Sequence, residues 1–395
     1  MVIDIIKKKR DGKTLTFEEL NSFVSGYVNG TVPDYQMSAL LMAIYFNGLT
    51  DVELSDLTKI MADSGDSLDL SKFGNLSVDK HSTGGVGDKT TLIVAPIVAS
   101  LGCKVAKMSG RGLGFTGGTC DKLCSIPGYR ITPGNDEFLS IVDTIGVSVV
   151  GQSANLVPAD KKMYALRDVT GTVDSIPLIA SSIMSKKIAA GAKNIVLDVK
   201  YGNGAFMETT DMALKLAETM VKIGKQCGRN TAAVISNMNK PLGFAVGNSL
   251  EVIEAINLLK GAKIPDLYDE CIAIAALMLS LCKDIPFDAA KRATEQSVCS
   301  GAALRKFNEW ISAQGGDISY IENTNKFKKA EYSKQVIAQN SGYISEMNTE
   351  RIGEISNMLG AGRKEINDNI DYSSGIYIFK KTGDYINKGD ILCTF

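Results

Sequence analysis

The sequence predicts an α/β protein with an N-terminal helical domain, a mostly parallel-sheet α/β domain and a small C-terminal α/β domain. Three observations carry this prediction. Helix-capping signals mark the first part of the chain, whereas from Leu76 short apolar runs alternate with glycine-rich turns and helical stretches. From about Asn325 the chain is richer in Lys, Asn, Tyr and Ser, with short alternating runs between turns. Uninterrupted apolar strands joined by helices are typical of a parallel sheet covered on both faces.

Two capping boxes define helices in the first domain, which we expect to span residues 1–68. Thr16 precedes Glu19 by three residues, and Thr50 precedes Glu53 by the same spacing. In this motif the threonine hydroxyl and the glutamate carboxylate each accept a backbone N–H at the start of a helix.

A strongly apolar segment lies between these two boxes. Pro33 is suited to open a helix there and Gly48 to end it. Such an apolar helix is buried either within the fold or in a subunit interface, and the sequence leaves both possibilities open. Residues 164–191 also have a helical pattern without a strand signal. We expect a segment of about 160–192 to pack on the N-terminal helices.

The α/β domain is expected over residues 72–324, and the small C-terminal domain over 325–395. Four short apolar runs provide the strands of the α/β domain: residues 104–108, 147–151, 194–199 and 232–238. Turn sequences such as KTGD and NKGD punctuate the C-terminal section and predict short antiparallel strands.

Composition limits the possible functions. With 395 residues, 45% of them apolar and 22% charged, the chain is typical of a globular protein of two or three domains. The net charge of -1 predicts no nucleic-acid partner. The longest apolar run, residues 272–282, is too short for a bilayer span, so we expect a buried helix and no membrane partner. Eight cysteines without a C-x-x-C motif, and a single histidine, argue against zinc and predict a reducing, cytoplasmic compartment.

Two glycine-rich loops, residues 82–91 (STGGVGDKTT) and 109–119 (SGRGLGFTGGT), are candidate anion sites. The first is not a Walker A loop, because Asp88 stands before Lys89 where that motif requires glycine. The second contains G-x-G-x-x-G, but the next strand ends in glycine and glutamine without the carboxylate that a dinucleotide ribose requires. Nucleotide binding is therefore disfavoured.

Both loops nevertheless carry groups that suit phosphate. They offer hydroxyls and cations at strand ends: Ser82, Thr90, Thr91, Ser109, Thr119, Lys80, Lys107 and Arg111. Backbone N–H groups at such positions bind phosphate or a sugar phosphate well. A single glycine loop more often merely turns the chain, but two in succession favour anion binding.

Four segments resemble the pyrimidine-nucleoside phosphorylase family. They read DKHSTGGVGDKTTL, KMSGRGLGFTGGTCDKL, YALRDVTGTVDSIPLIASSIMSKKIAAG and LDVKYGNGAFM, and the likeness covers nearly the whole chain. The resemblance implies a helical domain hinged to an α/β domain, a small C-terminal domain and a homodimer without an organic cofactor. It implies reversible phosphorolysis of uridine, deoxyuridine or thymidine by inorganic phosphate, giving free base and (deoxy)ribose 1-phosphate. Anthranilate phosphoribosyltransferases share this architecture, but DKHSTGG and SIMSKK favour the phosphorylases.

The resemblance also implies roles for individual residues. It assigns phosphate to Lys80, Ser82, Thr91, Lys107, Ser109 and Thr119. It assigns catalysis and base binding to His81, Arg167, Ser182 and Lys186. Arg167 and Lys186 would stabilise charge on the ring carbonyls, while His81 would donate to the leaving base. Domain closure would then bring phosphate to the anomeric carbon and exclude water. Without the resemblance, Arg167 would be read as a surface ion pair with Asp168 or Asp174, and Lys186 as a solvated side chain.

A structural potassium ion is implied as well. The matching positions are Gly87, Lys89, Leu242, Ala245 and Glu254. Lys89 could contribute only its backbone carbonyl to such an ion. Alternatively, its ammonium replaces the ion by pairing with Glu254.

Several positions depart from the family pattern. Phe115 replaces a histidine, Cys124 replaces a glutamate, and the chain stops at Phe395, earlier than family members normally do, which implies a shortened C-terminal domain. These departures support an alternative, a non-catalytic or impaired paralogue that binds nucleoside and phosphate. Lys107 stands where strictly thymidine-specific members tend to be apolar, which favours a broad substrate range.

Overall fold

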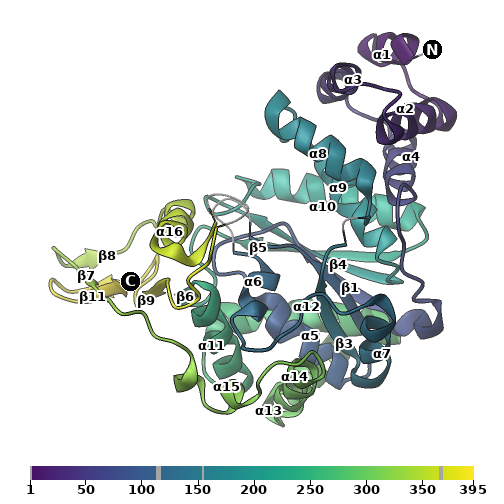
Figure 1. The fold of residues 1–395 in the computed structure, drawn as a ribbon. Helices are drawn as coiled ribbons and strands as arrows, with labels where there is room; N and C mark the ends of the chain where they lie inside the picture. The colour runs from purple at the N-terminus through teal and green to yellow at the C-terminus, as the bar shows by residue number, and fades with distance from the viewer. Residues whose placement is uncertain (1, 113–116, 154, 364–367) are drawn as a thin grey trace. The chain divides into compact units, whose positions relative to one another are not determined.

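The computed structural model describes residues 2–112, 117–153, 155–363 and 368–395 (Figure 1). By its internal contacts the chain divides into two compact units, which we describe separately. The first comprises Met1–Gly74, Gln152–Ile195 and Leu214–Ala233. The second comprises Asn75–Gly151, Val196–Ala213 and Val234–Phe395.

The first unit is helical. Its helices are α1 (Val2–Arg10), α2 (Phe17–Asn29), α3 (Asp34–Asn47), α4 (Asp51–Ala62), α8 (Pro158–Thr170), α9 (Ile176–Ala189) and most of α10 (Thr210–Gln226). Helix α8 packs on α2 and α3, and α9 packs on α4. The unit also includes residues 214–233, which the sequence had placed in the α/β domain.

Both predicted capping boxes are confirmed. The Thr16 hydroxyl accepts the Glu19 N–H at 3.3 Å, and the Glu19 carboxylate accepts the Thr16 N–H at 2.8 Å. Thr50 and Glu53 form the same pair of bonds at 3.3 and 2.8 Å. Glu53 is fully buried and also accepts from the Lys9 ammonium at 2.8 Å, so the second box ties α4 to α1.

Helix α3 buries one face of its apolar segment within the fold and leaves another exposed. It begins after Pro33 and ends before Gly48, as predicted. Met37, Leu41 and Ile44 are buried within the unit, where α3 packs on α1 and α8. A second face remains exposed, with Tyr35, Met42 and Phe46 at 74%, 36% and 77% exposure. Their spacing of seven and four residues places these three side chains on one side of the helix.

The second unit contains the parallel sheet, which confirms the predicted fold class. Its strands are β1 (Val78–Ser82), β2 (Val105–Ser109), β3 (Val147–Gly151), β4 (Asn194–Tyr201) and β5 (Asn230–Asn237), the last two beginning in the first unit. The strand order is β1-β4-β5, and β2 pairs with β3 in parallel register from Val105–Val147 to Ser109–Gly151. A parallel bridge between Ser77 and Lys104 joins the β1 side to β2.

Helices of this unit enclose its core. They are α5 (Thr90–Ser100), α6 (Thr119–Cys124), α7 (Asn135–Ile145), α11 (Asn248–Leu259), α12 (Pro265–Lys283), α13 (Phe287–Cys299), α14 (Ala302–Ala313) and α15 (Ser319–Glu322). Helix α5 contacts both α12 and α14, and its Ile93 and Ile97 are fully buried. The apolar run 272–282 forms part of α12, as predicted, and is largely buried. Within the described chain, no helix has the length and apolar character needed to cross a bilayer.

The C-terminal section adds antiparallel strands and helix α16 (Thr349–Ser356). These strands are β7 (Gln335–Ile337), β8 (Gly342–Tyr343), β9 (Ile376–Ile378), β10 (Tyr385–Ile386) and β11 (Ile391–Thr394). Strand β6 (Ala245–Val246), which precedes α11, pairs with β9 in a sheet of order β6-β9-β11-β7. The C-terminal section therefore shares a sheet with a segment of the α/β domain.

Candidate functional site

The first glycine-rich loop runs from the end of β1 to the start of α5. Thr83 links this loop to β4, because its N–H donates to the Asp198 carbonyl at 3.0 Å and its hydroxyl accepts from the Lys200 N–H at 2.9 Å. Gly87 has a φ of 75°, and a Cβ there would meet the Leu242 carbonyl oxygen at 2.6 Å. The loop thus requires glycine at position 87. Thr83 holds it against β4, and Gly87 packs closely against Leu242.

Lys80 is buried among carboxylates rather than free in solvent. Its ammonium lies 3.0 Å from Asp198 and 3.8 Å from Asp88, and it donates to the Thr90 hydroxyl at 2.5 Å. Burial alone would raise the pKa of Asp88, but the charges of Lys80 and Lys200 hold that pKa well below its usual range. Lys80 is therefore a fixed cation at the N-terminus of α5.

Lys107 joins β2, the strand before the second predicted phosphate loop, to β1, the strand before the first. Its ammonium donates to the Lys80 carbonyl at 2.5 Å and lies 3.4 Å from Asp79. The two lysines, on β1 and β2, are both almost fully buried. The remaining predicted phosphate residues lie at the same strand ends and helix starts: Ser82 on β1, Thr91 on α5, Ser109 on β2 and Thr119 on α6.

His81 lies on β1 between Lys80 and Ser82 and is half-buried. Successive side chains of a strand point to opposite faces, so the pleat places His81 opposite to Lys80. His81 is therefore next in the chain to the predicted phosphate residues Lys80 and Ser82, but its side chain lies on the other face of β1.

A buried charge network behind Lys80 was not found from the sequence. Lys200 lies 3.1 Å from Asp198 and 2.6 Å from Glu270 of α12. Burial raises the pKa of Glu270 to about 7, against the opposing charge of Lys200. The available signal was the pair Asp198 and Lys200 within an otherwise apolar strand, since charges in a buried strand require partners.

Three of the four residues predicted to bind the base, Arg167, Ser182 and Lys186, lie in the first unit, on α8 and α9, whereas His81 lies on β1 of the second unit. The Lys186 ammonium donates to the Ser182 hydroxyl at 3.0 Å, one helical turn away, and it forms an ion pair with Asp160 of α8. Asp160 is almost fully buried and was missed in the sequence. The Lys186 side chain is part-buried, and its ammonium pairs with a buried carboxylate rather than with solvent alone.

Arg167 is also not the surface ion pair that the sequence left open. Its side chain is 2% exposed, and its guanidinium donates to three backbone carbonyls at 2.6–3.2 Å. These are the carbonyls of Thr172, Val173 and Leu178, in the turn from α8 to α9 and the first turn of α9. Arg167 thereby fixes the connection between α8 and α9, the two helices that carry the residues predicted to bind the base.

The residues predicted for potassium surround an ammonium group. The Lys89 ammonium lies 2.5 Å from Glu254, 2.9 Å from the Leu242 carbonyl and 2.8 Å from the Ala245 carbonyl. An ammonium has three N–H donors, and these three oxygens use all of them. The set therefore does not fit a potassium ion beside this side chain. Across the described chain, no cluster of three His, Cys, Asp or Glu side chains could hold a metal ion.

The positions that depart from the family pattern are only partly described. Phe115 lies outside the described residues. Cys124 is partly buried, and burial raises the pKa of its thiol. Nearby, Asp121 is held by Arg363 at 2.9 Å and by Arg111 at 3.2 Å. All eight cysteines are free thiols.

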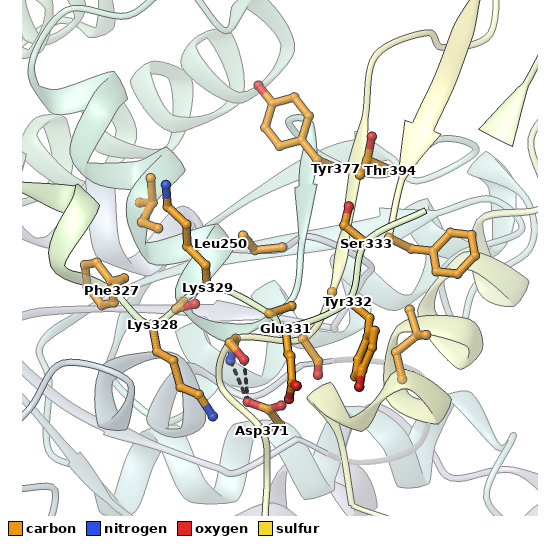
Figure 2. A pocket seen from close by; sticks show the side chains of 18 of the residues that line it. Leu250, Phe327, Lys328, Lys329, Glu331, Tyr332, Ser333, Asp371, Tyr377 and Thr394 are labelled. Atoms are coloured by element: carbon orange, nitrogen blue, oxygen red, sulfur yellow. Dashed lines mark hydrogen bonds between the residues drawn. The ribbon is translucent and has the colours of Figure 1, made fainter. Parts of the chain in front are cut away.

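A large cavity of the second unit lies apart from these residues. It has a volume of about 850 Å³ and is lined by the start of α11, residues 324–334, residues 371–377 and the end of β11. Figure 2 shows Lys328, Glu331 and Asp371 among its lining side chains. None of the predicted site residues lines it, so we do not place the chemistry there.

Comparison with known proteins agrees with this arrangement. Residues 3–65 match the glycosyl transferase family, helical bundle domain, and residues 74–304 match the glycosyl transferase family, a/b domain. Residues 343–395 match the pyrimidine nucleoside phosphorylase C-terminal domain. Among solved structures, an anthranilate phosphoribosyltransferase (TrpD) from Thermus thermophilus superposes with a TM-score of 0.64 at 18% identity, over 79% of this chain and 99% of that one. At that identity the likeness shows the fold alone.

Full-length relatives are more specific. The pyrimidine-nucleoside phosphorylases of Bacillus subtilis and Staphylococcus aureus (strain USA300) are 53% and 54% identical to this chain. That of Geobacillus stearothermophilus is 51% identical. Each alignment covers 100% of this chain and 91% of the relative. Together with the three domain matches, this similarity shows that the chain belongs to the pyrimidine-nucleoside phosphorylase family.

Proposed function

We propose that the protein catalyses reversible phosphorolysis of pyrimidine nucleosides, giving free base and (deoxy)ribose 1-phosphate. The observation that carries the proposal is the pair of buried lysines, Lys80 and Lys107, on the adjacent strands β1 and β2. The Lys107 ammonium donates to the Lys80 carbonyl, and the Lys80 ammonium donates to Thr90 at the start of α5. Helix N-termini and fixed cations at strand ends suit a phosphate group. The identity of 53% and 51% to two pyrimidine-nucleoside phosphorylases supports the same reaction.

We assign inorganic phosphate to the second unit. Lys80 and Lys107 supply charge, while Ser82, Thr91, Ser109 and Thr119 supply hydroxyl donors. The carboxylates of Asp88 and Asp198 keep the Lys80 ammonium charged and fixed, because burial alone would lower its pKa whereas these two charges raise it. A preorganised cation needs no rearrangement when the phosphate attacks the anomeric carbon.

We assign the pyrimidine base to Arg167, Ser182, Lys186 and His81. As the glycosidic bond breaks, negative charge develops on the ring, and the positive charges of Lys186 and Arg167 stabilise it. Arg167 acts as a fixed buried charge, because its guanidinium is already bound to three backbone carbonyls. The Ser182 hydroxyl hydrogen-bonds the ring edge, and His81 donates a proton or hydrogen bond to the leaving base. Asp160 positions Lys186 through their ion pair.

We infer a homodimer from the exposed face of α3. Tyr35, Met42 and Phe46 form an apolar surface on a helix whose other face is buried, and a second copy of the chain would cover it. The cytoplasmic compartment stays a prediction from the cysteine pattern. At the positions predicted for potassium, the described residues place the Lys89 ammonium where the ion would lie.

Nothing in the described residues favours the alternative of a non-catalytic or impaired paralogue.

Incubation of the purified protein with uridine, deoxyuridine or thymidine, with and without phosphate, tests the proposal. We expect base release only with phosphate, and from all three nucleosides if the predicted broad range holds. Absence of phosphate-dependent release from every nucleoside would overturn the proposal. Release from thymidine alone would overturn the broad range.

A further inference from the structure

The Lys89 ammonium occupies the centre of a preformed oxygen cage. Lys89 is 1% exposed, and Glu254 is 4% exposed. The Glu254 carboxylate is itself fixed, since it accepts the N–H groups of Phe244 at 2.7 Å and Ala245 at 3.1 Å. The cage therefore has two backbone carbonyls, one oriented carboxylate and no unused ammonium donor.

The backbone around the cage is closely packed. Gly243 has a φ of 67°, and a Cβ on it would lie 2.4 Å from Glu254 and 3.0 Å from the Lys89 nitrogen. A Cβ on Gly87 would likewise lie 2.6 Å from the Leu242 carbonyl oxygen. A potassium ion in the cage would displace the Lys89 ammonium from its three oxygens. The displaced ammonium would then remain buried next to the ion, so that two positive charges would lie side by side.

The cage joins three parts of the second unit. Lys89 directly precedes Thr90, the first residue of α5, whose hydroxyl accepts from Lys80. Leu242 precedes β6, Ala245 is the first residue of β6, and Glu254 lies on α11. The ammonium thus fastens the start of α5, which carries the proposed phosphate residue Thr91, to the sheet that β6 forms with the C-terminal section.

We propose that Lys89 is a built-in replacement for a bound monovalent cation, so that the protein orders its phosphate loop without potassium. Lys89 is a positioning residue, because its ammonium acts through α5. Its link to phosphate rests on the proposed function, but the replacement itself rests only on the cage.

The first test uses the unmodified protein in KCl, NaCl or choline chloride at equal ionic strength. We expect melting temperatures that agree within about 1 °C, and kcat/KM for phosphate within about twofold, because the protein has no cation to lose. A melting temperature or kcat/KM that falls in choline chloride and recovers with KCl would overturn the proposal. The melting temperature remains informative even if the protein has no phosphorylase activity.

The second test replaces the ammonium by an oxygen ligand. Lys89→Thr should lower the melting temperature in choline chloride, and KCl at about 100 mM should restore most of the loss, since a cation that binds only the folded state stabilises it. The KM for phosphate should rise at least about tenfold without KCl and return toward the parent value with it, while kcat changes less. Lys89→Met, which lacks a ligand atom, should be destabilised without recovery in KCl.

Lys9→Thr is the matched control. Lys9 is also buried beside a fully buried glutamate, Glu53, and its ammonium donates to that carboxylate at 2.8 Å. Among the described residues, no backbone carbonyl accepts from this ammonium, so it lacks the cage that surrounds Lys89. Its loss of stability should not depend on the identity of the cation. Equal insensitivity of Lys89→Thr to potassium would contradict the proposal, as would equal recovery of both variants.

Discussion

Glu270→Gln should change how the stability of the protein depends on pH. Burial raises the pKa of Glu270 from its usual 4.5 to about 7 in the folded state. Folded Glu270 therefore keeps a proton that the unfolded chain releases between these two values. Because the unfolded state then binds fewer protons, the free energy of unfolding falls as pH rises through this window.

The size of the effect follows from the shift. One pKa unit corresponds to about 1.4 kcal/mol, so Glu270 should cost about 2–3 kcal/mol of stability between pH 5 and pH 8. Glutamine keeps an oxygen that can accept from the Lys200 ammonium, as Glu270 does at 2.6 Å, but it cannot ionise. Relative to the parent, the variant should thus gain about 2–3 kcal/mol from pH 5 to pH 8, which corresponds to about 3 °C in melting temperature for a chain of this length.

Thermal or urea unfolding at half-unit steps from pH 5 to pH 8 measures the difference between the two proteins. Taking the difference removes the other titrating groups. Asp88 and Asp198 would not imitate the effect, since their lowered pKa values place their contribution at more acidic pH, where stability is lost as pH falls. Parallel pH profiles for the parent and the variant would refute a raised pKa at Glu270.

Three further predictions address the proposed site and the proposed dimer. His81→Ala should lower kcat/KM by about 10²–10⁴-fold with an unchanged melting temperature, as expected for a group that assists the leaving base, and a loss below about threefold would make His81 a scaffold residue. Arg167→Ala should cost about 2–4 kcal/mol of stability, measured by urea unfolding, because three backbone carbonyls lose a charged donor; a cost below about 1 kcal/mol would show that these bonds are not needed. Phe46→Glu should convert a dimer into a monomer in size-exclusion chromatography with light scattering, whereas Lys13→Glu, an exposed substitution outside that face, should not; a dimer that survives Phe46→Glu would exclude this face as the interface.

Local signals predicted much of the fold. The capping boxes at Thr16 and Thr50 begin helices as expected, since a capping box involves only residues three apart. Pro33 and Gly48 bound α3 for the same reason. The apolar runs form strands and part of α12, because the length of a run and its flanking turns distinguish these elements even where periodicity does not.

Long-range electrostatics could not be predicted in the same way. Lys200 meets Glu270 seventy positions later in the chain, and Lys186 meets Asp160 on a different helix. Such partners depend on tertiary packing. The residues alone therefore left a solvated Lys186 open, whereas the structure pairs its part-buried ammonium with the buried Asp160. The direction of the Lys89 side chain was likewise open, because both a carbonyl ligand and an ammonium are compatible with the same residue.

Phosphorus NMR of a reaction with uridine and inorganic phosphate tests the central proposal most directly. We predict that the phosphate signal declines as a sugar 1-phosphate signal grows, in step with the release of uracil and only when both substrates are present. Uracil release without loss of inorganic phosphate would indicate hydrolysis, and no change in either signal with any of the three nucleosides would contradict the proposed phosphorolysis.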